Sequence, residues 1–327
     1  MTILVTGGAG YIGSHVVHAL ADQARRVIVL DNLSTGFRDM VHRNASLVVG
    51  DVGDEQLVSR LVRENDIDAI IHFAASAVVP ESVADPIGYY RNNTLNSLLL
   101  IDVAIRHGVK HFVFSSTSAV YGNPVAVPVK EDVQPQPMSP YGASKLMTET
   151  ILGDVARASD LKYTVLRYFN VAGADPNLLI GQSSAAATHL IKVAVQCALG
   201  IRQGMDVFGT DYPTEDGTCI RDYIHVSDLA RAHIAALAYL GEGGQSVTLN
   251  CGYGHGYSVL EVIDAVKRVS GVDFPVALRG RRAGDPACIV ADTSLIRKVF
   301  SWIPAYDNLD TIVGHALAWE KKLVKRG

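Results

Sequence analysis

A tyrosine and a lysine four positions apart are the most informative pair of chemical groups in this 327-residue chain. Tyr141 and Lys145 follow the proline-rich run 135–140 and begin a helical pattern. Residues at i and i+4 share one helix face, so the phenol and the ammonium can point into one cleft. Lowering the pKa of a tyrosine from about 10 to about 7 requires roughly 4 kcal/mol. One cation at about 4 Å supplies that much in an effective dielectric of ~20. The pair therefore predicts a tyrosine that acts as a base near neutral pH.

Three consecutive hydroxyl residues are candidates for a third catalytic group. Ser115, Ser116 and Thr117 follow the apolar run 111–114, which is typical of a buried strand. Hydroxyls at the carboxyl end of a parallel strand can reach a substrate bound at that edge of the sheet. Because Ser and Thr are also ordinary turn residues, this pattern leaves open which of the three takes part.

The beginning of the chain predicts a site for a dinucleotide. A β-branched run at 2–6 leads into glycines at positions 7, 10 and 13, and a helical pattern follows at 14–21. Glycine lets backbone N–H groups approach a pyrophosphate, and the helix N-terminus adds its positive dipole end. Asp31 ends the next expected strand, at 26–31. A carboxylate there binds the adenosine ribose and repels a 2′-phosphate, which predicts NAD rather than NADP.

The elements that must position these groups alternate in type along the first half of the chain. Further strands are expected at 47–50, 69–73, 111–115 and 163–167, and helices at 55–64, 89–106 and 141–158. This alternation predicts an α/β protein with a doubly wound parallel sheet, a Rossmann fold. Beyond Asn170, loops rich in Gly, Pro and Asp separate shorter elements, which predicts a smaller α/β lobe over the carboxyl ends of the strands. The capping box Ser258-x-x-Glu261 marks the start of one of its helices.

Composition argues against several other classes of protein. A net charge of −4 gives no basic footprint, so no nucleic-acid partner is expected. No apolar run approaches the ~18 residues of a membrane helix. The four cysteines are far apart and form no Cys-x-x-Cys pair, so we expect reduced thiols in the cytoplasm. No metal site is expected either, because Gly108 should end a helix between His107 and His111.

Taken together, the motifs resemble the extended short-chain dehydrogenase/reductase superfamily and, within it, the family of UDP-glucose 4-epimerases. The superfamily resemblance rests on the glycine turn and Tyr141-x-x-x-Lys145. The finer resemblance spans essentially the whole chain, and its most specific stretch runs from Phe208 to Val226. Other matching stretches are Asp31-Asn32-Leu33, His72-Phe73-Ala74-Ala75, Tyr89-Tyr90-Arg91-Asn92-Asn93, 139–145, 167–174 and 281–286.

This resemblance implies an enzyme that interconverts UDP-glucose and UDP-galactose. The implied reaction is an NAD-mediated oxidation at C4, rotation of the 4-keto sugar and re-reduction on the other face. Tyr141 would be the base, Lys145 its activator and a ribose ligand, and Thr117 the catalytic hydroxyl. Residues 1–170, with a returning segment at about 218–250, would form the NAD-binding Rossmann domain. Residues 171–217 and 251–327 would form the UDP-sugar-binding lobe.

The family's binding positions carry over residue by residue. Those for the cofactor are Gly7, Gly10, Tyr11, Ile12, Gly13, Asp31, Asn32, Asp51, Val52, Phe73, Ala74, Ala75, Asn92, Ser115, Tyr141, Lys145 and Tyr168. Those for the substrate are Thr117, Tyr141, Phe169, Asn170, His189, Leu190, Phe208, Arg221, Tyr223, Arg282, Asp285 and Ile289. Arg221 and Arg282 offer planar cations for the two phosphates, and Asp285 can accept from ribose hydroxyls.

The sequence departs from the family pattern at two positions. Ala77 stands where some relatives place a lysine near the cofactor, and His189 where many place Asn. Counted without gaps from Asp285, Ile289 takes the position that faces the 2-substituent of the sugar, whereas a one-residue shift would place Cys288 there. Isoleucine is intermediate in bulk, so we expect UDP-glucose and UDP-galactose as the main pair, with weak or no activity on N-acetyl sugars.

The sequence bears on three alternative functions and on the assembly. A nucleotide-sugar 4,6-dehydratase would place an Asp-Glu pair directly after the catalytic Thr, and Ser118-Ala119 cannot do that chemistry. A UDP-glucuronate 4-epimerase or decarboxylase, and a non-catalytic NAD-sensing Rossmann protein, stay open. The resemblance also implies a homodimer that pairs through the helices at 89–106 and 141–158.

Overall fold

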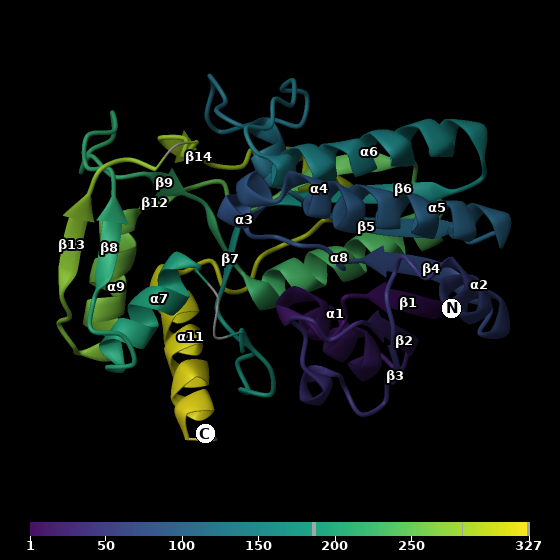
Figure 1. The fold of residues 1–327 in the computed structure, drawn as a ribbon, viewed down its shortest axis with the longest axis horizontal. Coiled ribbons are helices and arrows are strands. Elements are labelled where there is room, and N and C mark those ends of the chain that lie inside the picture. Colours follow the sequence, from purple (N-terminus) through teal and green to yellow (C-terminus); the bar gives the residue numbers. More distant parts are fainter. Residues whose placement is uncertain (185–187, 283, 326–327) are drawn as a thin grey trace.

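A seven-stranded parallel sheet forms the centre of the molecule, whose computed structural model describes residues 1–184, 188–282 and 284–325 (Figure 1). Its strand order is β11-β6-β5-β4-β1-β2-β3. The strands are β1 (Thr2–Thr6), β2 (Arg26–Asp31), β3 (Ser46–Val49), β4 (Ile67–His72), β5 (His111–Thr117), β6 (Lys162–Tyr168) and β11 (Val247–Cys251). The order changes direction between β1 and β4, and ligands bind at the carboxyl ends of strands at such a point.

Helices cover both faces of this sheet. One face carries α2 (Glu55–Glu64), α5 (Asn96–Arg106) and α6 (Pro140–Ala158), and the other carries α1 (Tyr11–Asp22) and α8 (Val226–Gly241). Alternate residues of a strand point to opposite faces. Accordingly, Ile3 and Val5 of β1 belong to the hydrophobic cluster beneath α1 and α8, whereas Leu4 belongs to the cluster beneath α2, α5 and α6. The strand is apolar at every position because both faces are covered.

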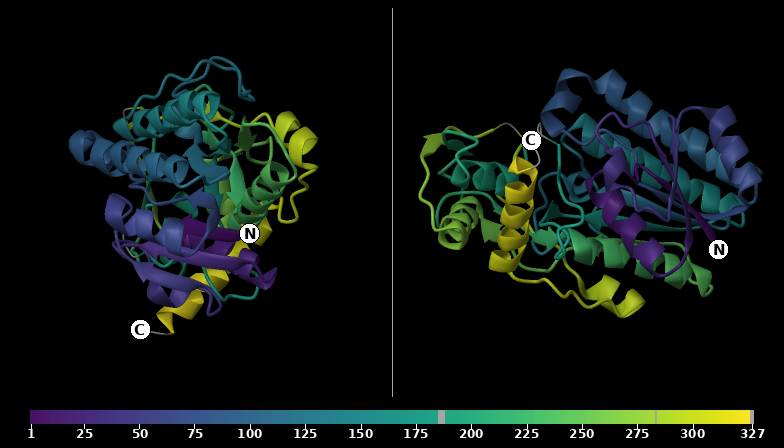
Figure 2. Two further views of the ribbon diagram at one scale, coloured as in Figure 1. Left: turned by 90° about the vertical axis from the view of Figure 1, so that its right-hand side faces the viewer. Right: turned by 90° about the horizontal axis from the view of Figure 1, so that it is seen from below.

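A smaller lobe lies beyond one end of the sheet (Figure 1, left). Its strands form three small sheets: β7 (Asn170–Ala172) with β10 (Tyr223–His225), β8 (Met205–Phe208) with β13 (Val276–Arg279), and β9 (Ile220–Arg221) with β12 (Tyr257–Ser258) and β14 (Cys288–Ile289). Its longer helices are α7 (Leu190–Ala198), α9 (Val259–Ser270) and α11 (Leu309–Val324), whereas α10 (Ser294–Phe300) packs against α8 and β11 of the central sheet. Seen from below, α11 lies between the lobe and the sheet (Figure 2, right).

The chain passes between the two parts more than once. It leaves the sheet after β6, returns as α8 and β11, and then enters the lobe again. β11 pairs in parallel with β6, with Val247 opposite Thr164 and Cys251 opposite Tyr168. The outermost strand of the sheet on this side is therefore supplied by a late segment of the chain.

Most element boundaries agree with the sequence expectations. β1, β2 and α2 occupy 2–6, 26–31 and 55–64 as expected, and the capping box of Ser258 and Glu261 begins α9. β4 ends one residue earlier than expected, at His72, whereas β5 continues to Thr117. α5 ends at Arg106, and Gly108 adopts a positive φ of 71° two residues later.

The single helix expected over 89–106 is wrong in its first half. The chain forms α4 (Pro86–Tyr89), a π-helical segment η2 (Tyr90–Leu95) and only then α5. The remaining short helices are α3 (Val79–Ala84), η1 (Arg38–Met40) and η3 (Ser118–Tyr121). A π-helical turn places one extra residue in a helix and is frequent at functional sites. Here it places two adjacent asparagines, Asn92 and Asn93, against the loop after β4.

Candidate active site

The glycine turn after β1 is packed so closely that side chains do not fit. Gly7 has a φ of 70°, and a Cβ there would lie 2.6 Å from the amide nitrogen of Ala74. A Cβ on Gly13 would overlap the carbonyl oxygen of Gly7. α1 begins at Tyr11, and Gly10 caps it without a side chain. The first N–H groups of the helix have no intrahelical partner, which makes this end a site for an anion.

Asp31 has a structural task that the sequence analysis did not anticipate. Its Oδ2 accepts the backbone N–H of Ala9 in the glycine turn at 2.9 Å. Its Oδ1 accepts the N–H of Leu33 at 2.8 Å. The carboxylate therefore shapes the turn and points to its rim. Nearby, Asn32 donates to Asp51 at 2.9 Å, which joins the ends of β2 and β3.

The loop after β4 lies against the π-helical segment. Asn92 donates to the Ser76 hydroxyl at 2.9 Å, and Asn93 donates to the Ser76 carbonyl at 2.9 Å. Asn93 also donates to the Ser144 hydroxyl on α6 at 3.0 Å. Phe73 packs on His233, with 4.7 Å between ring centroids. The expected cofactor positions Phe73, Ala74, Ala75 and Asn92 thus come from two segments that are bonded to each other and to the catalytic helix.

Tyr141 lies in the first turn of α6. Ser139 caps this helix by accepting the N–H of Gly142 at 3.2 Å, and Pro140 occupies its first position, where no N–H is needed. Burial raises the pKa of Tyr141 well above its ordinary value, and a hydrogen bond with the Thr117 hydroxyl opposes this shift. A phenol at this place needs a nearby cation to become a phenolate.

Lys145 lies one helical turn further along α6, on the same helix face as Tyr141. Its Nζ donates to the carbonyl oxygen of Ser115 at 3.1 Å and lies 4.9 Å from the centroid of the Phe114 ring. Burial lowers the pKa of Lys145 to about 7, and the charge of Glu149 opposes this shift. Tyr141 and Lys145 are buried together at the carboxyl end of β5.

The structure gives the three hydroxyls at the end of β5 different partners. Ser115 donates to the Tyr168 hydroxyl at 3.0 Å, and Ser116 donates to the Glu149 carboxylate at 2.5 Å. The Thr117 hydroxyl accepts the N–H of Ala119 at 3.1 Å, and of the three hydroxyls it is the one whose hydrogen bonding lowers the pKa of Tyr141. This arrangement favours Thr117 as the hydroxyl that shares a substrate atom with the tyrosine.

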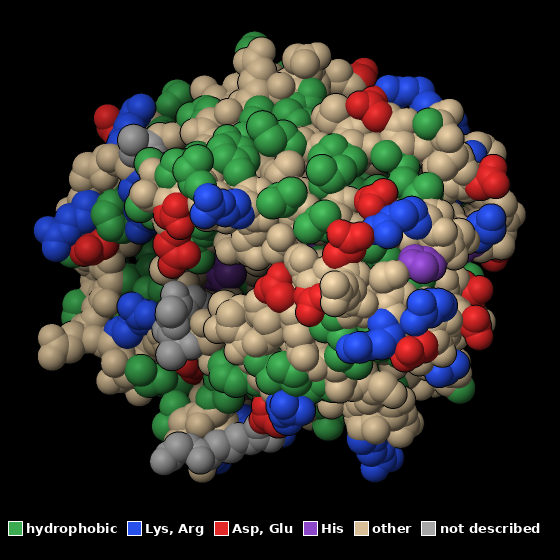
Figure 3. All heavy atoms as spheres, turned by 45° about the vertical axis from the view of Figure 1, so that its right-hand side comes forward, with side chains coloured by type: hydrophobic (Ala, Val, Ile, Leu, Met, Phe, Trp, Pro, Cys, Tyr) green, Lys and Arg blue, Asp and Glu red, His purple; other side chains and the backbone are tan. Residues whose placement is uncertain are grey.

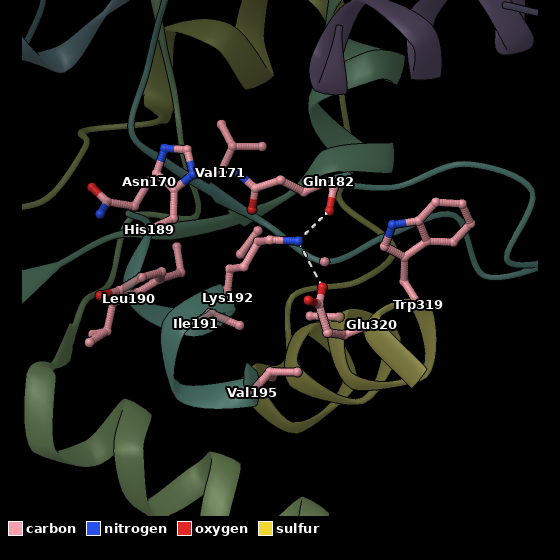
Figure 4. A pocket seen from close by; sticks show the side chains of 14 residues that line it. Asn170, Val171, Gln182, His189, Leu190, Ile191, Lys192, Val195, Trp319 and Glu320 are labelled. Carbon is pink, nitrogen blue, oxygen red and sulfur yellow. Dashed lines mark hydrogen bonds and ion pairs between the residues drawn. The ribbon is translucent and has the colours of Figure 1, made fainter. Parts of the chain in front are cut away.

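Four expected substrate residues line one pocket of the lobe. They are Asn170, His189, Leu190 and Tyr223. His189 caps α7 and is hydrogen-bonded through Nδ1 to Gln182 (Figure 4). Burial lowers the pKa of His189, so its ring is neutral near pH 7. Beside it, the buried Lys192 donates to Glu320 and to the Gln182 carbonyl, both at 2.7 Å.

The remaining expected substrate residues form two pairs and one packed cluster. The distance between Nη2 of Arg221 and Oδ1 of Asp285 is 3.7 Å. The guanidinium of Arg282 lies over the ring of Phe208 at the end of β8. Ile289 and Phe169 are both buried, in a hydrophobic cluster with Tyr121 and three smaller residues. The cysteine next to Ile289 is half-buried.

Sequence reasoning missed a buried aspartate between two of these residues. Asp222 accepts backbone N–H groups of Tyr253, Gly254 and Ala291 at 2.9 to 3.3 Å. Burial nevertheless raises its pKa to about 6. These hydrogen bonds fix two segments, at 253–254 and at 291, around Arg221 and Tyr223. Its position inside the most specific stretch of the sequence was the only signal for it.

The family model described as the NAD-dependent epimerase/dehydratase family matches residues 3–252. The chain belongs to this family. Within the described residues, no group of three or more His, Cys, Asp or Glu side chains could hold a metal ion. None of the described helices has the length and apolarity to cross a membrane.

Several relatives of this family match the chain over nearly its full length. The UDP-glucose 4-epimerase of Azospirillum brasilense is 54% identical over 321 residues, covering 98% of this chain and 92% of that protein. The structure of UDP-glucose 4-epimerase from Brucella ovis in complex with NAD is 44% identical, with a TM-score of 0.94 and 97% of each chain covered. The UDP-Glc/GlcNAc 4-epimerase of Campylobacter jejuni is 49% identical, with a TM-score of 0.87, and 98% of this chain and 99% of that one are covered.

NAD is the cofactor of the family, and the residues present fit it. The glycine turn leaves room for a pyrophosphate and offers the first N–H groups of α1. Asp31 directs a carboxylate to the rim of that turn, where it disfavours a 2′-phosphate. The expected cofactor positions continue through the loop after β4 to Tyr141 and Lys145 at the end of β5.

Proposed function

We propose that this protein interconverts UDP-glucose and UDP-galactose by oxidation and re-reduction at C4 of the sugar. The observation that carries the proposal is the cluster of Tyr141, Lys145 and Thr117 at the carboxyl end of β5, the same edge of the parallel sheet at which the glycine turn follows β1. The whole-length similarity to proteins named UDP-glucose 4-epimerase supports the choice of substrate. Bound NAD supplies a reversible hydride acceptor for C4.

Tyr141 is the proposed base in both directions. Its phenolate accepts the proton of the C4 hydroxyl during oxidation and returns it during reduction. Lys145 stabilises the phenolate electrostatically and contacts the cofactor ribose. Thr117, which is hydrogen-bonded to Tyr141, holds the same sugar oxygen in place. Since every proton taken is returned, the protein changes only the configuration at C4.

The lobe holds the nucleotide while the hexose turns. Arg221 and Arg282 bind the diphosphate, and Asp285, which already faces Arg221, accepts from the ribose of UDP. The ring of Phe208 packs against the uracil ring of UDP. Asn170, His189, Leu190 and Tyr223 line the pocket that receives the diphosphate end. Anchoring through the phosphates leaves the 4-keto sugar free to present its other face to the cofactor.

The same proposal assigns the two parts of the fold. Residues 1–170 with the returning segment at about 218–250 bind NAD, and residues 171–217 and 251–327 bind the UDP-sugar. The position of β11 in the central sheet, and of α8 against it, supports including the returning segment in the cofactor part.

We also propose a homodimer in the cytoplasm. Exposed hydrophobic side chains gather on the helices beside the sheet, on the upper part of the face shown in Figure 3. They are Val79, Val83, Ile87, Leu95, Leu98 and Met147, from α3 to α6. An apolar surface of this kind is typical of an interface between subunits. The four cysteines are free thiols, which suits a reducing compartment.

The experiment that tests the function is incubation of the purified protein with UDP-galactose and no added NAD. We expect UDP-glucose to form, because the cofactor is retained through the whole cycle. A non-catalytic NAD-binding protein would form no product, and neither would an enzyme specific for UDP-glucuronate. Parallel incubations with UDP-glucuronate and with UDP-N-acetylglucosamine identify those alternatives directly.

A further inference from the structure

A buried ion pair lies directly behind the proposed base and its lysine. Glu149 stands four residues after Lys145 on α6, so the two side chains share a helix face. Its carboxylate accepts from Arg167 on β6, at 2.6 Å to Nη2 and 3.1 Å to Nε. Both side chains are less than a tenth exposed. Arg167 is itself fixed, since it stacks on the Tyr121 ring and donates to the Tyr121 hydroxyl at 3.0 Å.

The same carboxylate holds the strand end that carries the catalytic hydroxyl. Ser116 donates to Glu149, while the flanking residues face the active groups. The Ser115 carbonyl accepts from Lys145, and the Thr117 hydroxyl is bonded to Tyr141. Glu149 therefore contacts the residue that lies between the partners of the lysine and of the tyrosine.

The ammonium of Lys145 takes part in no ion pair within the described chain. Its hydrogen bond goes to a neutral carbonyl, and its other close neighbour is the face of Phe114. Removing such an ammonium from water favours the neutral amine, and a nearby anion favours the charged form. Burial lowers the pKa of Lys145, and the charge that opposes this shift is that of Glu149.

The other titratable groups around the lysine and tyrosine do not supply a negative charge at neutral pH. His72 on β4 is neutral, because burial lowers its pKa to about 3. Tyr168 on β6 and Tyr89 on α4 stay protonated, because burial raises the pKa of each phenol. Arg167 is a cation whose charge is directed at the carboxylate. This leaves Glu149 as the anion that faces Lys145.

We propose that Glu149 is a positioning residue for the reaction, whose buried carboxylate keeps Lys145 in its charged ammonium form. The charged lysine stabilises the phenolate of Tyr141, so Glu149 acts on the base through the lysine. Arg167 and Ser116 hold the carboxylate in place for this purpose. The inference rests on the proposed function, in which Tyr141 is the base.

The test compares Glu149→Gln with the double variant Glu149→Gln/Arg167→Met. Glutamine keeps the size of the side chain and can still bond Ser116, but it has no charge. Because the single variant leaves Arg167 buried without its partner, it can fail to fold, whereas the double variant removes both charges together. Circular dichroism and retained NAD identify folded protein in each case.

In both folded variants we expect kcat to stay high over a narrower range of pH, with little change in KM. Lys145 loses its proton at lower pH, and Tyr141 requires higher pH to ionise. Each unit of pKa shift changes the charged fraction about tenfold, so kcat near neutral pH falls by about that factor. A folded double variant that keeps the wild-type pH profile would overturn the inference.

Two further variants separate the possible causes. Asp154→Asn removes a carboxylate on the exposed side of the same helix, where it is paired with Arg157, and should leave the pH midpoints unchanged. Tyr141→Phe tests the proposed function itself. If this variant turns over at the wild-type rate, Tyr141 is not the base, and this inference loses its premise. An inactive Tyr141→Phe beside an unshifted double variant would instead refute only the role of Glu149. The ionisation of Tyr141 can also be measured without turnover. The difference in tyrosinate absorbance between each protein and the same protein with Tyr141→Phe, followed during a pH titration, gives the same pH midpoints.

Discussion

The guanidinium carbon of Arg282 lies 3.7 Å from the centroid of the Phe208 ring. The neighbouring Arg281 stacks in the same way on Tyr212, at 4.2 Å, and bonds Asp211. Guanidinium groups stack on aromatic rings and keep their edge N–H donors free. Through these two contacts, residues 281–282 lie along the end of β8, and each arginine places a planar cation next to an aromatic ring. A nucleoside diphosphate needs both features.

Replacing Arg282 with alanine should weaken substrate binding more than it slows turnover. A hydrogen bond to a charged group contributes ~1.5–3 kcal/mol, so KM for UDP-galactose should rise about ten- to a hundredfold. Steady-state kinetics measure this, with Arg279→Ala as a control, because Arg279 pairs with Asp206 on the exposed side of β13. An unchanged KM would show that Arg282 does not hold the diphosphate.

Tyr141→Phe should remove most turnover and leave the fold and the bound cofactor intact. Only the proton acceptor is lost, and general bases contribute about 10²–10⁴ in rate. The measurement is kcat with UDP-galactose, together with the NAD content of the purified protein. Tyr239→Phe is the matched control, since the Tyr239 hydroxyl accepts from Gln245 at the end of α8, outside the site. A loss below about tenfold would contradict the assignment of Tyr141 as the base.

The titration of Lys145 should be visible in the stability of the cofactor-free protein. Its pKa is about 7 in the folded chain, whereas an unfolded lysine titrates near ~10.4. Between these values the unfolded chain binds a proton that the folded chain does not, so the free energy of unfolding rises with pH. Urea unfolding from about pH 7 to about pH 9.5 measures this slope. Lys145→Met removes the titrating group and should flatten the slope; equal slopes in the two proteins would place the lysine outside a buried site.

Substrate range should depend on Ile289. Its side chain is buried beside Phe169 and Tyr121, and it takes the position that we expect to face the 2-substituent of the sugar, so shortening it should open space there. We expect low activity of the wild type on UDP-N-acetylglucosamine. For Ile289→Ala we expect the kcat/KM ratio of UDP-N-acetylglucosamine to UDP-glucose to rise by roughly 10–200-fold.

Cys288→Ala is the control for this variant, because it changes the neighbouring residue on the same short strand. The relative from Campylobacter jejuni is named for both UDP-Glc and GlcNAc. Comparable kcat/KM values of the wild type for both sugars would show that Ile289 does not close the site. If Cys288→Ala changes the kcat/KM ratio of the two sugars more than Ile289→Ala does, then Cys288 and not Ile289 is the specificity position.

A charge placed on the exposed hydrophobic helices should separate the subunits. Leu98 on α5 is 43% exposed, and Leu98→Arg buries a charge if this face lies in an interface. Light scattering at micromolar concentration should give a dimer for the wild type and a monomer for the variant. Ile303→Arg places the same charge at an exposed apolar residue of the lobe and should leave the dimer intact. A monomeric wild type would refute the proposed assembly.

The sequence predicted best those features that lie within one element or one turn. The glycine positions, the acid at the end of β2 and the Tyr141–Lys145 pair depend on local spacing, and the structure places all of them at one edge of the sheet. β1, β2 and α2 match at both ends because their apolar patterns stop sharply at polar or glycine residues. The π-helical segment at 90–95 has no comparable signal, because an extra residue in a helix leaves the surrounding pattern helical.

Contacts between distant segments could not be predicted in this way. Glu149 and Arg167 look like ordinary surface charges of a helix and a strand until the sheet places them together. Asp31 was predicted to bind a ribose, and its bonds to two backbone amides appear only once the turn is folded. The choice among Ser115, Ser116 and Thr117 likewise depended on partners from α6 and β6.

The outer strand β11 comes from a segment late in the sequence, and this limits how the chain can be divided into fragments. A fragment that ends after β7 would keep every glycine of the turn, Tyr141 and Lys145. It would nevertheless leave β6 as an open edge, with the backbone groups that β11 satisfies unpaired. It would also expose the apolar face that α8 covers. Such an edge is a template for pairing with other chains, so we expect a continuous fragment that ends after β7 to aggregate.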